Sequence, residues 1–422
     1  MIRLPIDLAI AQLAHRLSAA SPEAESGPRL FVPFGPGEPL GFREMLKATA
    51  GWPERMCFVG APIPGINRTD WSGLRDGATS EGIFVSADWR AAFEAGRYAL
   101  RPLTWFQTYG WLGQTPLDAA VFQVSPPDAG GMVTLSVASD LAPAVMARPE
   151  VFKLALINPN LPAVNGPRWP LAAFDLVAED DSAVLDYDAG DLDPAFEVIS
   201  RHIANLAPDG ASLQFGVGKA GVAALKGLRG RRGLKIHSGM VTDPLVDLLD
   251  EDVVDSITTG LAAGTARLRE RLGDPRITFA DSGHTHDISV LAAIPRLVAV
   301  NSALEIDLFG QANAEFQGGR QVSGIGGLTD FLRGARLSDG GLPILALPAS
   351  AKGDSISRIV PRLSPGVVSV PRADIGLVIT EHGVADLRGR TLDERAQALI
   401  GVASPAHRDN LSNIWDEMRR AV

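Results

Sequence analysis

The sequence predicts an open α/β fold, in which helices cover a mainly parallel sheet, and three observations support this prediction. From residue 194 onward, short apolar runs alternate with helix-like segments at the lengths typical of βα units. Glycine-rich loops follow several of the expected strands, where open α/β sheets bind their ligands. The composition, with 46% hydrophobic and 21% charged residues, is that of a globular protein and excludes disordered, collagen-like and coiled-coil chains.

The length of 422 residues predicts more than one domain, because a single domain typically holds roughly 100–200 residues. We expect an N-terminal domain over residues 1–190 and a C-terminal domain over residues 191–422. The acidic residues that follow Ala178 and continue to Asp193 predict a solvated crossover between the two.

The expected elements differ in regularity along the chain. Residues 1–17 predict a first helix and residues 119–124 a strand, within a region of short strands, long loops and few helices. After residue 190 the order is regular. Strands are expected at 211–215, 234–238, 297–309, 342–348 and 375–380, and helices at 196–207, 222–228, 243–250, 329–335 and 394–403. Thr391 and Glu394 have the spacing of a capping box, and Ser404 followed by Pro405 predicts the cap of the last helix.

Charge and cysteine content limit the possible partners and the compartment. The net charge of -10 argues against a broad binding surface for nucleic acid or an anionic membrane. The single cysteine, Cys57, excludes an internal disulfide and a cysteine-based zinc site, which is typical of a reducing cytoplasm. No apolar run approaches the ~18 residues of a membrane-spanning helix, and the N-terminus lacks a signal-peptide core, so we expect a soluble, cytoplasmic protein.

Three glycine-rich loops are candidates for binding an anion. Gly216–Gly221 forms a G-x-G-x-x-G pattern between an expected strand and an expected helix, whose N-terminus offers unpaired N–H groups. A nicotinamide dinucleotide site would need a carboxylate at the end of the next strand, but that strand ends His237-Ser238-Gly239. Residues 323–327 and 349–353 form two more loops, each of which alone indicates only a tight turn. Together, with a lysine in two of them, the loops favour a long phosphorylated ligand.

An ordered series of motifs carries a resemblance to a known family. The motifs are QVSPPDAGG (123–131), VTLSVASD (133–140), LQFGVG (213–218), IHSGM (236–240), NSALEIDLFGQ (301–311), SGIGG (323–327), SAKG (350–353), RIVP (358–361), ITEHGVADLRG (379–389) and ERAQALIGVASPAHRDNL (394–411). They resemble the acetyl-CoA hydrolase/transferase family, close to the 4-hydroxybutyrate CoA-transferases of class I. The resemblance spans about residues 110–415 and is strongest after residue 200.

The resemblance implies two similar open α/β CoA-transferase-type domains with the active site between them and CoA mostly on the second. It implies acyl-CoA as substrate, a small carboxylic acid as a possible second substrate, no metal, and a homo-oligomer. The residues that it assigns to CoA are Gly216, Val217, Gly218, Lys219, Ala220, Leu304, Ser323, Gly324, Gly326, Gly327 and Lys352.

The main departure from the family pattern is at Gly239. In the family a glutamate at this position attacks the acyl-CoA thioester, and a glutamyl-CoA thioester then forms through an acyl anhydride. Glycine has no side chain, so transfer through this position is chemically impossible.

Several other residues are candidates to replace the glutamate. Glu305 lies on an expected strand two residues from Asp307, so both face the same way, although the resemblance favours a structural role for it. His237 and Ser238 flank the glycine and are candidates to act on a water, or simply pack at the strand end. His284 and His286, with Asp287, form either a base or metal pair or a packed loop.

The sequence therefore favours an acyl-CoA-processing enzyme whose chemistry differs from ordinary transfer, with hydrolysis as its plainest form and carbon–carbon cleavage as an analogy from related folds. The alternatives are a CoA-transferase with a displaced carboxylate such as Glu305, a non-catalytic CoA-binding protein, and an engineered variant without its nucleophile. Glu381-His382 is expected to be structural. An aromatic cluster is expected either to line an acyl pocket or to form first-domain core: Trp105, Phe106, Tyr109 and Trp111.

Overall fold

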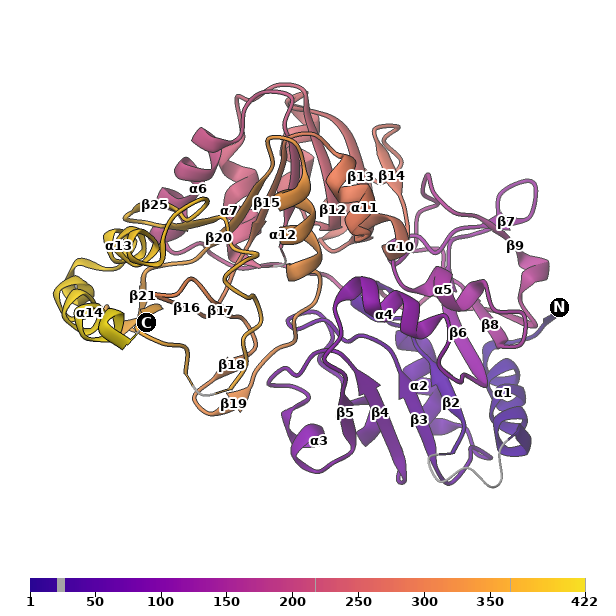
Figure 1. Cartoon of the computed structure of the whole chain (residues 1–422). Helices are drawn as coiled ribbons and strands as arrows, with labels where there is room; N and C mark the ends of the chain where they lie inside the picture. Colours follow the sequence, from indigo (N-terminus) through magenta and orange to yellow (C-terminus); the bar gives the residue numbers. More distant parts are fainter. Residues whose placement is uncertain (21–26, 217, 365, 422) are drawn as a thin grey trace. The chain divides into compact units, whose positions relative to one another are not determined.

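The chain forms two compact units, each built from α-helices and β-strands (Figure 1). The computed structural model describes residues 1–20, 27–216, 218–364 and 366–421. The first unit consists of Met1–Asp188, Val241–Asp243 and Thr258–His284, and the second of Ala189–Met240, Pro244–Ile257 and Thr285–Val422. The α/β class predicted from the sequence is confirmed.

The first sheet has eight strands in the order β1-β10-β8-β6-β2-β3-β4-β5, and every neighbouring pair is parallel. Its strands are β1 (Ile2–Arg3), β2 (Arg29–Phe31), β3 (Met56–Val59), β4 (Ala78–Gly82), β5 (Tyr98–Leu100), β6 (Ala119–Val124), β8 (Phe152–Ile157) and β10 (Leu176–Glu179). The helices of this region are α1 (Ile6–Ala20), α2 (Leu40–Ala48), α3 (Arg90–Glu94), α4 (Trp105–Leu112) and α5 (Ala142–Met146), and β7 (Met132–Val133) pairs with β9 (Trp169–Pro170).

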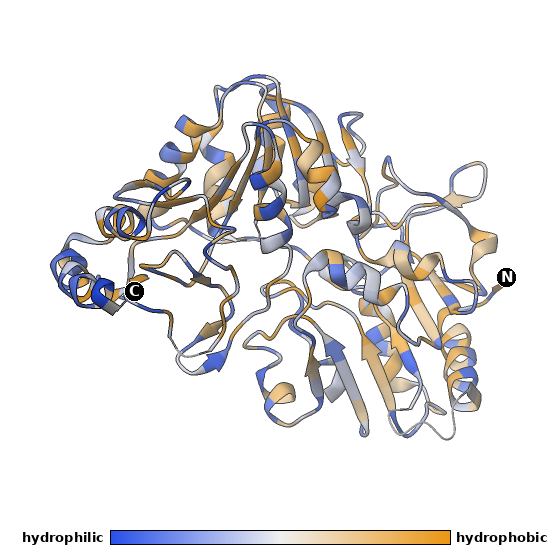
Figure 2. Cartoon of the chain, viewed as in Figure 1, coloured by the Kyte–Doolittle hydropathy of each residue, from blue (hydrophilic) through white to orange (hydrophobic). Residues whose placement is uncertain are grey.

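This region is more regular than its sequence indicated. The strand predicted at 119–124 is confirmed as β6, and all six of its residues are buried. Parallel strands covered on both faces show continuous apolar runs instead of alternation, so the short strands around β6 carry little sequence signal. Figure 2 shows that hydrophobic residues concentrate on the central strands of each sheet.

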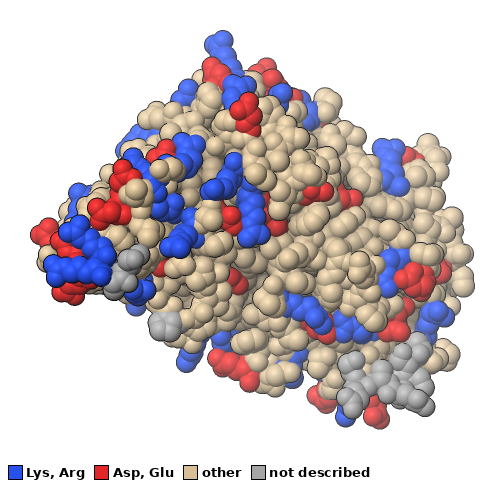
Figure 3. Space-filling view, in the orientation of Figure 1, with Lys and Arg blue, Asp and Glu red and all other residues tan. Residues whose placement is uncertain are grey.

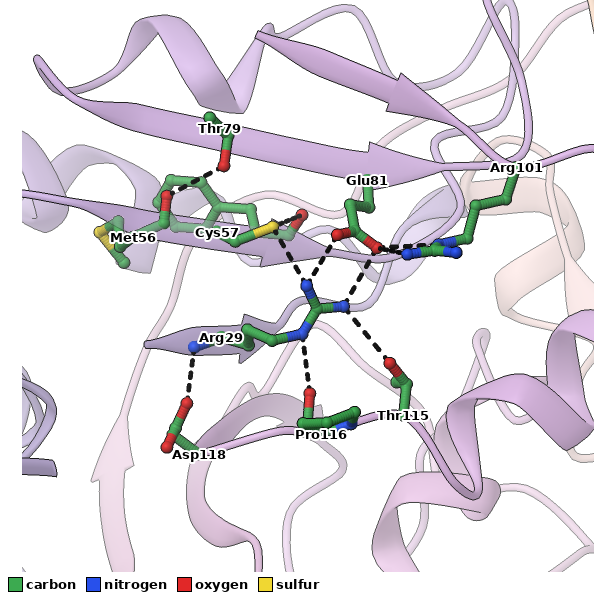
Figure 4. Close-up of polar contacts among 10 residues, drawn as sticks. Arg29, Met56, Cys57, Thr79, Glu81, Arg101, Thr115, Pro116 and Asp118 are labelled. Atoms are coloured by element: carbon green, nitrogen blue, oxygen red, sulfur yellow. Dashed lines mark hydrogen bonds and ion pairs between the residues drawn. The ribbon is translucent and has the colours of Figure 1, made fainter. Parts of the chain in front are cut away.

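A polar network ties the start of β2 to its neighbours (Figure 4). The Arg29 guanidinium donates to both oxygens of Glu81 on β4, at 2.7 and 3.0 Å, and the Arg101 Nε donates to the same carboxylate at 2.8 Å. The backbone N–H of Arg29 donates to Asp118, just before β6, at 2.7 Å. Although burial opposes ionisation of Glu81, the hydrogen bonds from the two arginines hold the pKa of this carboxyl below its usual value.

The second sheet has the order β14-β13-β12-β11-β15-β20-β24-β25. The strands are β11 (Ser212–Phe215), β12 (Leu234–Val241), β13 (Val254–Ala262), β14 (Ile277–Phe279), β15 (Leu297–Asn301), β20 (Leu342–Ala346), β24 (Leu377–Thr380) and β25 (Gly383–Asp386). The run β12-β11-β15-β20-β24 is parallel, and β25 is antiparallel to β24. The helices are α6 (Pro194–Leu206), α7 (Lys219–Gly227), α8 (Pro244–Asp250), α9 (Ala266–Arg269), α10 (Ser282–Thr285), α11 (Ile288–Ala293), α12 (Leu328–Leu337), α13 (Leu392–Val402) and α14 (Pro405–Met418).

Small sheets follow β15. They pair β16 (Glu305–Asp307) with β17 (Ala312–Asn313) and β23 (Ile359–Val360), β18 (Phe316–Gln317) with β19 (Arg320–Gln321), and β21 (Ser350–Ala351) with β22 (Ile356–Ser357). The single strand predicted at 297–309 is therefore wrong, because β15 and β16 belong to different sheets. Apolar residues lie on both sides of Asn301 and Ser302, and neither Gly nor Pro marks a turn there, so the pattern does not show that the chain turns after Asn301.

Two of the smaller predictions need correction. The Thr391–Glu394 capping box is confirmed, and Ser404 is the N-cap residue of α14 with Pro405 opening the helix, but the Ser404 hydroxyl makes no capping hydrogen bond and instead donates to Asp354 at 2.9 Å. In the acidic stretch expected to be solvated, Asp180 is buried and accepts hydrogen bonds from the backbone N–H and hydroxyl of Ser182, both at 3.0 Å. Among the described residues, no helix is long and apolar enough to cross a membrane.

Asn67 organises a buried polar cluster in the first unit. Its side-chain oxygen accepts from the backbone N–H groups of Gly35 and Ile63, both at 2.8 Å. Its amide donates to the Gly35 carbonyl at 3.0 Å and to the Glu38 carboxylate at 2.7 Å, and the indole of Trp71 donates to the other oxygen of Glu38 at 3.0 Å. Asn67 and Glu38 are each only 1% exposed, so this one amide satisfies polar groups that water does not reach.

Asn67→Ala is expected to lower the free energy of unfolding by about 1–3 kcal/mol, because it leaves buried partners without hydrogen bonds. The measurement is urea unfolding followed by circular dichroism, with the exposed Asn413→Ala as the matched control. Equal unfolding midpoints for the two variants would contradict the assigned role of Asn67.

Candidate active site

The first and third glycine loops follow parallel strands of one sheet in the second unit, whereas the second loop follows the short strand β19. The first loop follows β11, and Gly239 lies near the end of β12. Asn301 ends β15, and the third loop follows β20. Because these strands are parallel and adjacent in the sheet, their carboxyl ends lie along one edge, where α/β sheets bind ligands.

The first loop joins β11 to α7 with glycines at positions that require them. Gly218 precedes α7 with φ of 108°, a backbone conformation that favours glycine, and a Cβ there would meet open space. A Cβ on Gly221 would overlap the carbonyl oxygen of Gly216. Lys219 and Ala220 form the first turn of α7, whose leading N–H groups have no partner within the helix. Val217 lies outside the described residues.

The second loop, Ser323–Gly327, leads into α12. Gly326 has φ of 54°, and Gly327 is the residue that precedes the helix. The side-chain amide of Gln321 donates to the Ser323 carbonyl at 2.8 Å, and the Ser323 hydroxyl contacts the carbonyl of Gly324 at 3.4 Å. Preceding residues thus hold the start of this loop, and the Ser323 N–H also donates to the Glu315 carbonyl at 3.3 Å.

The third loop and Leu304 complete the set of residues expected to bind CoA. Lys352 is exposed and has φ of 51°. The backbone N–H of Ala349 donates to Glu381, just after β24, at 2.8 Å, which gives Glu381 a structural role. The N–H of Leu304 donates to the Asn313 carbonyl at 2.8 Å, so this N–H is already paired within the protein.

The ring of His286 occupies the space beside Gly239. A Cβ built on Gly239 would lie 2.6 Å from Cε1 and 2.7 Å from Nε2 of His286. A Cβ built on Gly327 would lie 2.8 Å from both Cδ2 and Nε2 of the same ring. The ring also packs against Phe331 on α12, with centroids 4.6 Å apart. His286 is therefore enclosed by two glycines and an aromatic ring, and it fills the volume into which a side chain at position 239 would project.

His286 is electrically neutral in this position. Its side chain is 3% exposed, and burial, together with the nearby His237, lowers its pKa to about 3. Its Nδ1 lies 2.9 Å from the hydroxyl oxygen of Thr285, and Nε2 of His237 lies 3.1 Å from the Thr285 carbonyl oxygen. Thr285 thus contacts both imidazoles.

From the sequence, His286 is a candidate only together with His284 and Asp287. Asp287 instead accepts from the backbone N–H of Ser289 at 2.7 Å and caps α11. Within the described ranges, no group of three or more histidines, cysteines or carboxylates is arranged to hold a metal ion. The pairing of His286 with Gly239 is not visible in the sequence, because 46 intervening residues separate them.

Ser238 and Glu305, two other candidates, are engaged in structural hydrogen bonds. The Ser238 hydroxyl is buried and contacts the carbonyls of Met240 at 2.9 Å and Phe215 at 3.2 Å. The Glu305 carboxylate accepts from the Asn313 amide at 3.1 Å, and from the N–H and hydroxyl of Ser364 at 3.0 and 3.2 Å. Both groups therefore hold the backbone in place.

The aromatic residues of α4 do not form one pocket wall. Trp105 is buried and lines a small hollow in the first unit. Phe106 is 36% exposed, and the guanidinium of Arg101 lies over the ring of Trp111 at 4.8 Å. The Tyr109 hydroxyl bonds to Asp281, and burial raises its pKa to about 12. Of the four, the structure places only Trp105 against that hollow.

The charged surface is mixed on the face that Figure 3 shows, where Lys and Arg side chains alternate with Asp and Glu.

Comparison with known proteins places the chain in a family. The model of the acetyl-CoA hydrolase/transferase C-terminal domain matches residues 264–414. The chain is 32% identical over 346 residues to 4-hydroxybutyrate coenzyme A transferase of Clostridium kluyveri, an alignment that covers 78% of this chain and 80% of the relative. It is 31% identical over 230 residues to acetyl-CoA hydrolase of Saccharomyces cerevisiae, covering 51% of this chain and 41% of that protein.

A solved structure extends the likeness to almost the whole chain. RipA from Yersinia pestis superposes with a TM-score of 0.87 and 28% identity over 98% of this chain and 99% of RipA. Together with the parallel sheets and the glycine loops at their strand ends, these matches show that the chain is an enzyme belonging to the acetyl-CoA hydrolase/transferase family.

Proposed function

We propose that this enzyme hydrolyses acyl-CoA thioesters without forming a glutamyl-CoA intermediate at position 239. The observation that carries the proposal is the contact between Gly239 and the ring of His286. Position 239 offers no carboxylate, and the adjoining space is filled by a neutral imidazole. The two-step exchange that the family resemblance implies has no nucleophile here.

The loops for CoA are proposed to keep their role. The N-terminus of α7, preceded by Gly218, presents backbone N–H groups suited to a phosphate. Lys219 begins that helix, and Lys352 adds a second cation after β21. Neither contribution depends on a side chain at position 239. CoA binding is therefore expected to remain although Gly239 has no side chain.

In the proposed reaction, water attacks the thioester carbonyl, the C–S bond breaks, and the CoA thiolate takes up a proton as the free acid forms. Any charge that develops on the carbonyl oxygen requires nearby hydrogen-bond donors. We assign this task to the backbone N–H groups of the second loop, because Gly327 contacts the same His286 ring as Gly239, and leave those of α7 to the phosphate.

A CoA-transferase with Glu305 as a displaced nucleophile is less well supported. The Glu305 carboxylate accepts three hydrogen bonds from Asn313 and Ser364. An attack by this carboxylate would break contacts that anchor the surrounding loop.

Free CoA is expected to appear from acyl-CoA substrates without an added acid, and acetate is expected not to increase the rate. The measurement is thiol release from a panel of acyl-CoAs, with and without acetate, alongside intact-protein mass. Transfer of CoA to acetate, with an adduct that borohydride removes, would refute the proposal, and mapping of that adduct to Glu305 would establish the alternative.

Gly239→Glu alone is expected to abolish thiol release without producing transfer, because its Cβ would meet the His286 ring at 2.6 Å. The double variant Gly239→Glu/His286→Gly removes that ring, and we expect it to form a glutamyl-CoA adduct that hydroxylamine releases. Gly401→Glu is the matched control, since a Cβ there meets open space. Robust transfer by the single variant would mean that the ring does not block position 239.

Lys352→Ala is expected to weaken CoA binding by roughly 1–3 kcal/mol, the scale of a hydrogen bond to a charged group. Calorimetric titration of CoA measures this change. Lys226→Ala removes an exposed lysine from the other end of α7 and should leave the affinity unchanged. Equal effects of the two substitutions would remove Lys352 from the CoA site.

A further inference from the structure

The third glycine loop contains the turn of a short β-hairpin with an unusual backbone. Strands β21 and β22 pair antiparallel, and residues 352–355 connect them. Lys352, Gly353 and Asp354 follow one another with φ of 51°, 61° and 70°. Residues with a Cβ rarely adopt this left-handed conformation, because it costs them free energy. A hairpin with two residues in each strand is also not stable by itself in water, so other segments must hold this turn.

Asp354 connects the turn to the start of α14. The Ser404 hydroxyl donates to its carboxylate at 2.9 Å, and the Ser350 side chain bonds to the same carboxylate. Nε2 of His407 lies 2.9 Å from the Asp354 carbonyl oxygen, a contact in which only the ring nitrogen can donate. The bonds from Ser404 and Ser350 hold the pKa of Asp354 below its usual value, so the carboxylate is ionised at neutral pH.

Further hydrogen bonds hold the rest of the loop and leave the Lys352 side chain exposed. The Ser355 hydroxyl donates to the Lys352 carbonyl at 2.9 Å. At the base of the hairpin, the N–H of Ala349 donates to Glu381 at 2.8 Å, and the N–H of Arg358 donates to the Ala349 carbonyl at 2.9 Å. In the part of the chain that the structure describes, the ammonium group of Lys352 takes part in no ion pair. The network therefore fixes the backbone around a lysine that it does not itself use.

We propose that Asp354 is a positioning residue, which holds the turn in the conformation that directs Lys352 toward a phosphate of CoA. This inference rests on the CoA contact proposed above for Lys352. Asp354 acts through the backbone of the turn and does not itself contact the ligand. Without its bonds, the left-handed backbone is free to relax, and Lys352 then projects in another direction. The inference also gives a role to Ser404 and His407, which no step of the proposed hydrolysis uses.

The test is calorimetric titration of CoA into the full-length protein and its variants. Asp354→Ala is expected to raise the Kd about fivefold, the factor that one ordinary hydrogen bond contributes, because affinity falls with the share of molecules in the binding conformation. Asp354→Gly accepts the backbone angles but loses the side-chain bonds, so it should weaken binding similarly. Asp354→Asn should bind CoA as the parent does, since an amide bonds to both serine hydroxyls and Asn tolerates left-handed backbone.

The matched control is Asp252→Ala, at an exposed aspartate that follows α8 with φ of 51°. It removes the same side chain from the same backbone conformation, and it should leave the Kd unchanged. If Asp354→Ala lowers the urea unfolding midpoint more than Asp252→Ala does, Asp354→Gly becomes the deciding variant, because glycine adopts this backbone without strain.

A double-mutant cycle distinguishes positioning of Lys352 from a general effect on the fold. In a Lys352→Ala protein, Asp354→Ala is expected to cause no further loss of affinity, because both substitutions remove the same contact. Additive losses would overturn the proposal. So would parent-like binding by Asp354→Gly, or binding by Asp354→Asn that is as weak as that of Asp354→Ala.

The titration is independent of turnover, so it separates this inference from the proposed reaction. Transfer of CoA to acetate by the parent protein would refute hydrolysis and leave the coupling of Asp354 to Lys352 as measured. Additive losses in the cycle would refute the positioning role alone. Absence of CoA binding by the parent would refute both the positioning role and the CoA role of the loops.

Discussion

Parallel pairing in register is the constraint on which the second unit depends. The pairs β11–β12, β11–β15, β15–β20 and β20–β24 are all parallel. All of these strands therefore begin at one edge of the sheet and end at the opposite edge. The first and third glycine loops therefore lie at one edge of the sheet although more than a hundred residues separate them. Their placement there follows from strand direction and not from their own sequences.

His286 shows how one contact can change the chemistry available to a fold. A carboxylate at position 239 and an imidazole at 286 compete for one volume, because the ring lies against both Gly239 and Gly327. Protein interiors are close-packed, so such a volume holds one group at a time. In the proposed function, glycine in place of the family glutamate thus changes the partners of two loops and of α12, and not only one side chain.

The sequence predicted most of the second unit and much less of the first. Glycine spacing, the Thr391–Glu394 capping box and the ordered motifs are local signals, and they correctly indicated strands, helices and family. The break between β15 and β16 was missed because apolar residues continue after Asn301 and Ser302 without a Gly or Pro to mark the turn. The position of His286 beside Gly239 and Gly327 depends on contacts between distant segments, and no local pattern reports such contacts.

The division of the chain into units has a consequence for how the protein is made. The first unit includes Val241–Asp243 and Thr258–His284 as well as Met1–Asp188. No single cut in the chain therefore yields either unit as one complete fragment. During synthesis the first unit lacks its last segment, which contains β14, until residue 284 has left the ribosome. Folding of the two units is therefore interleaved in time, and the first cannot be finished before part of the second has been translated.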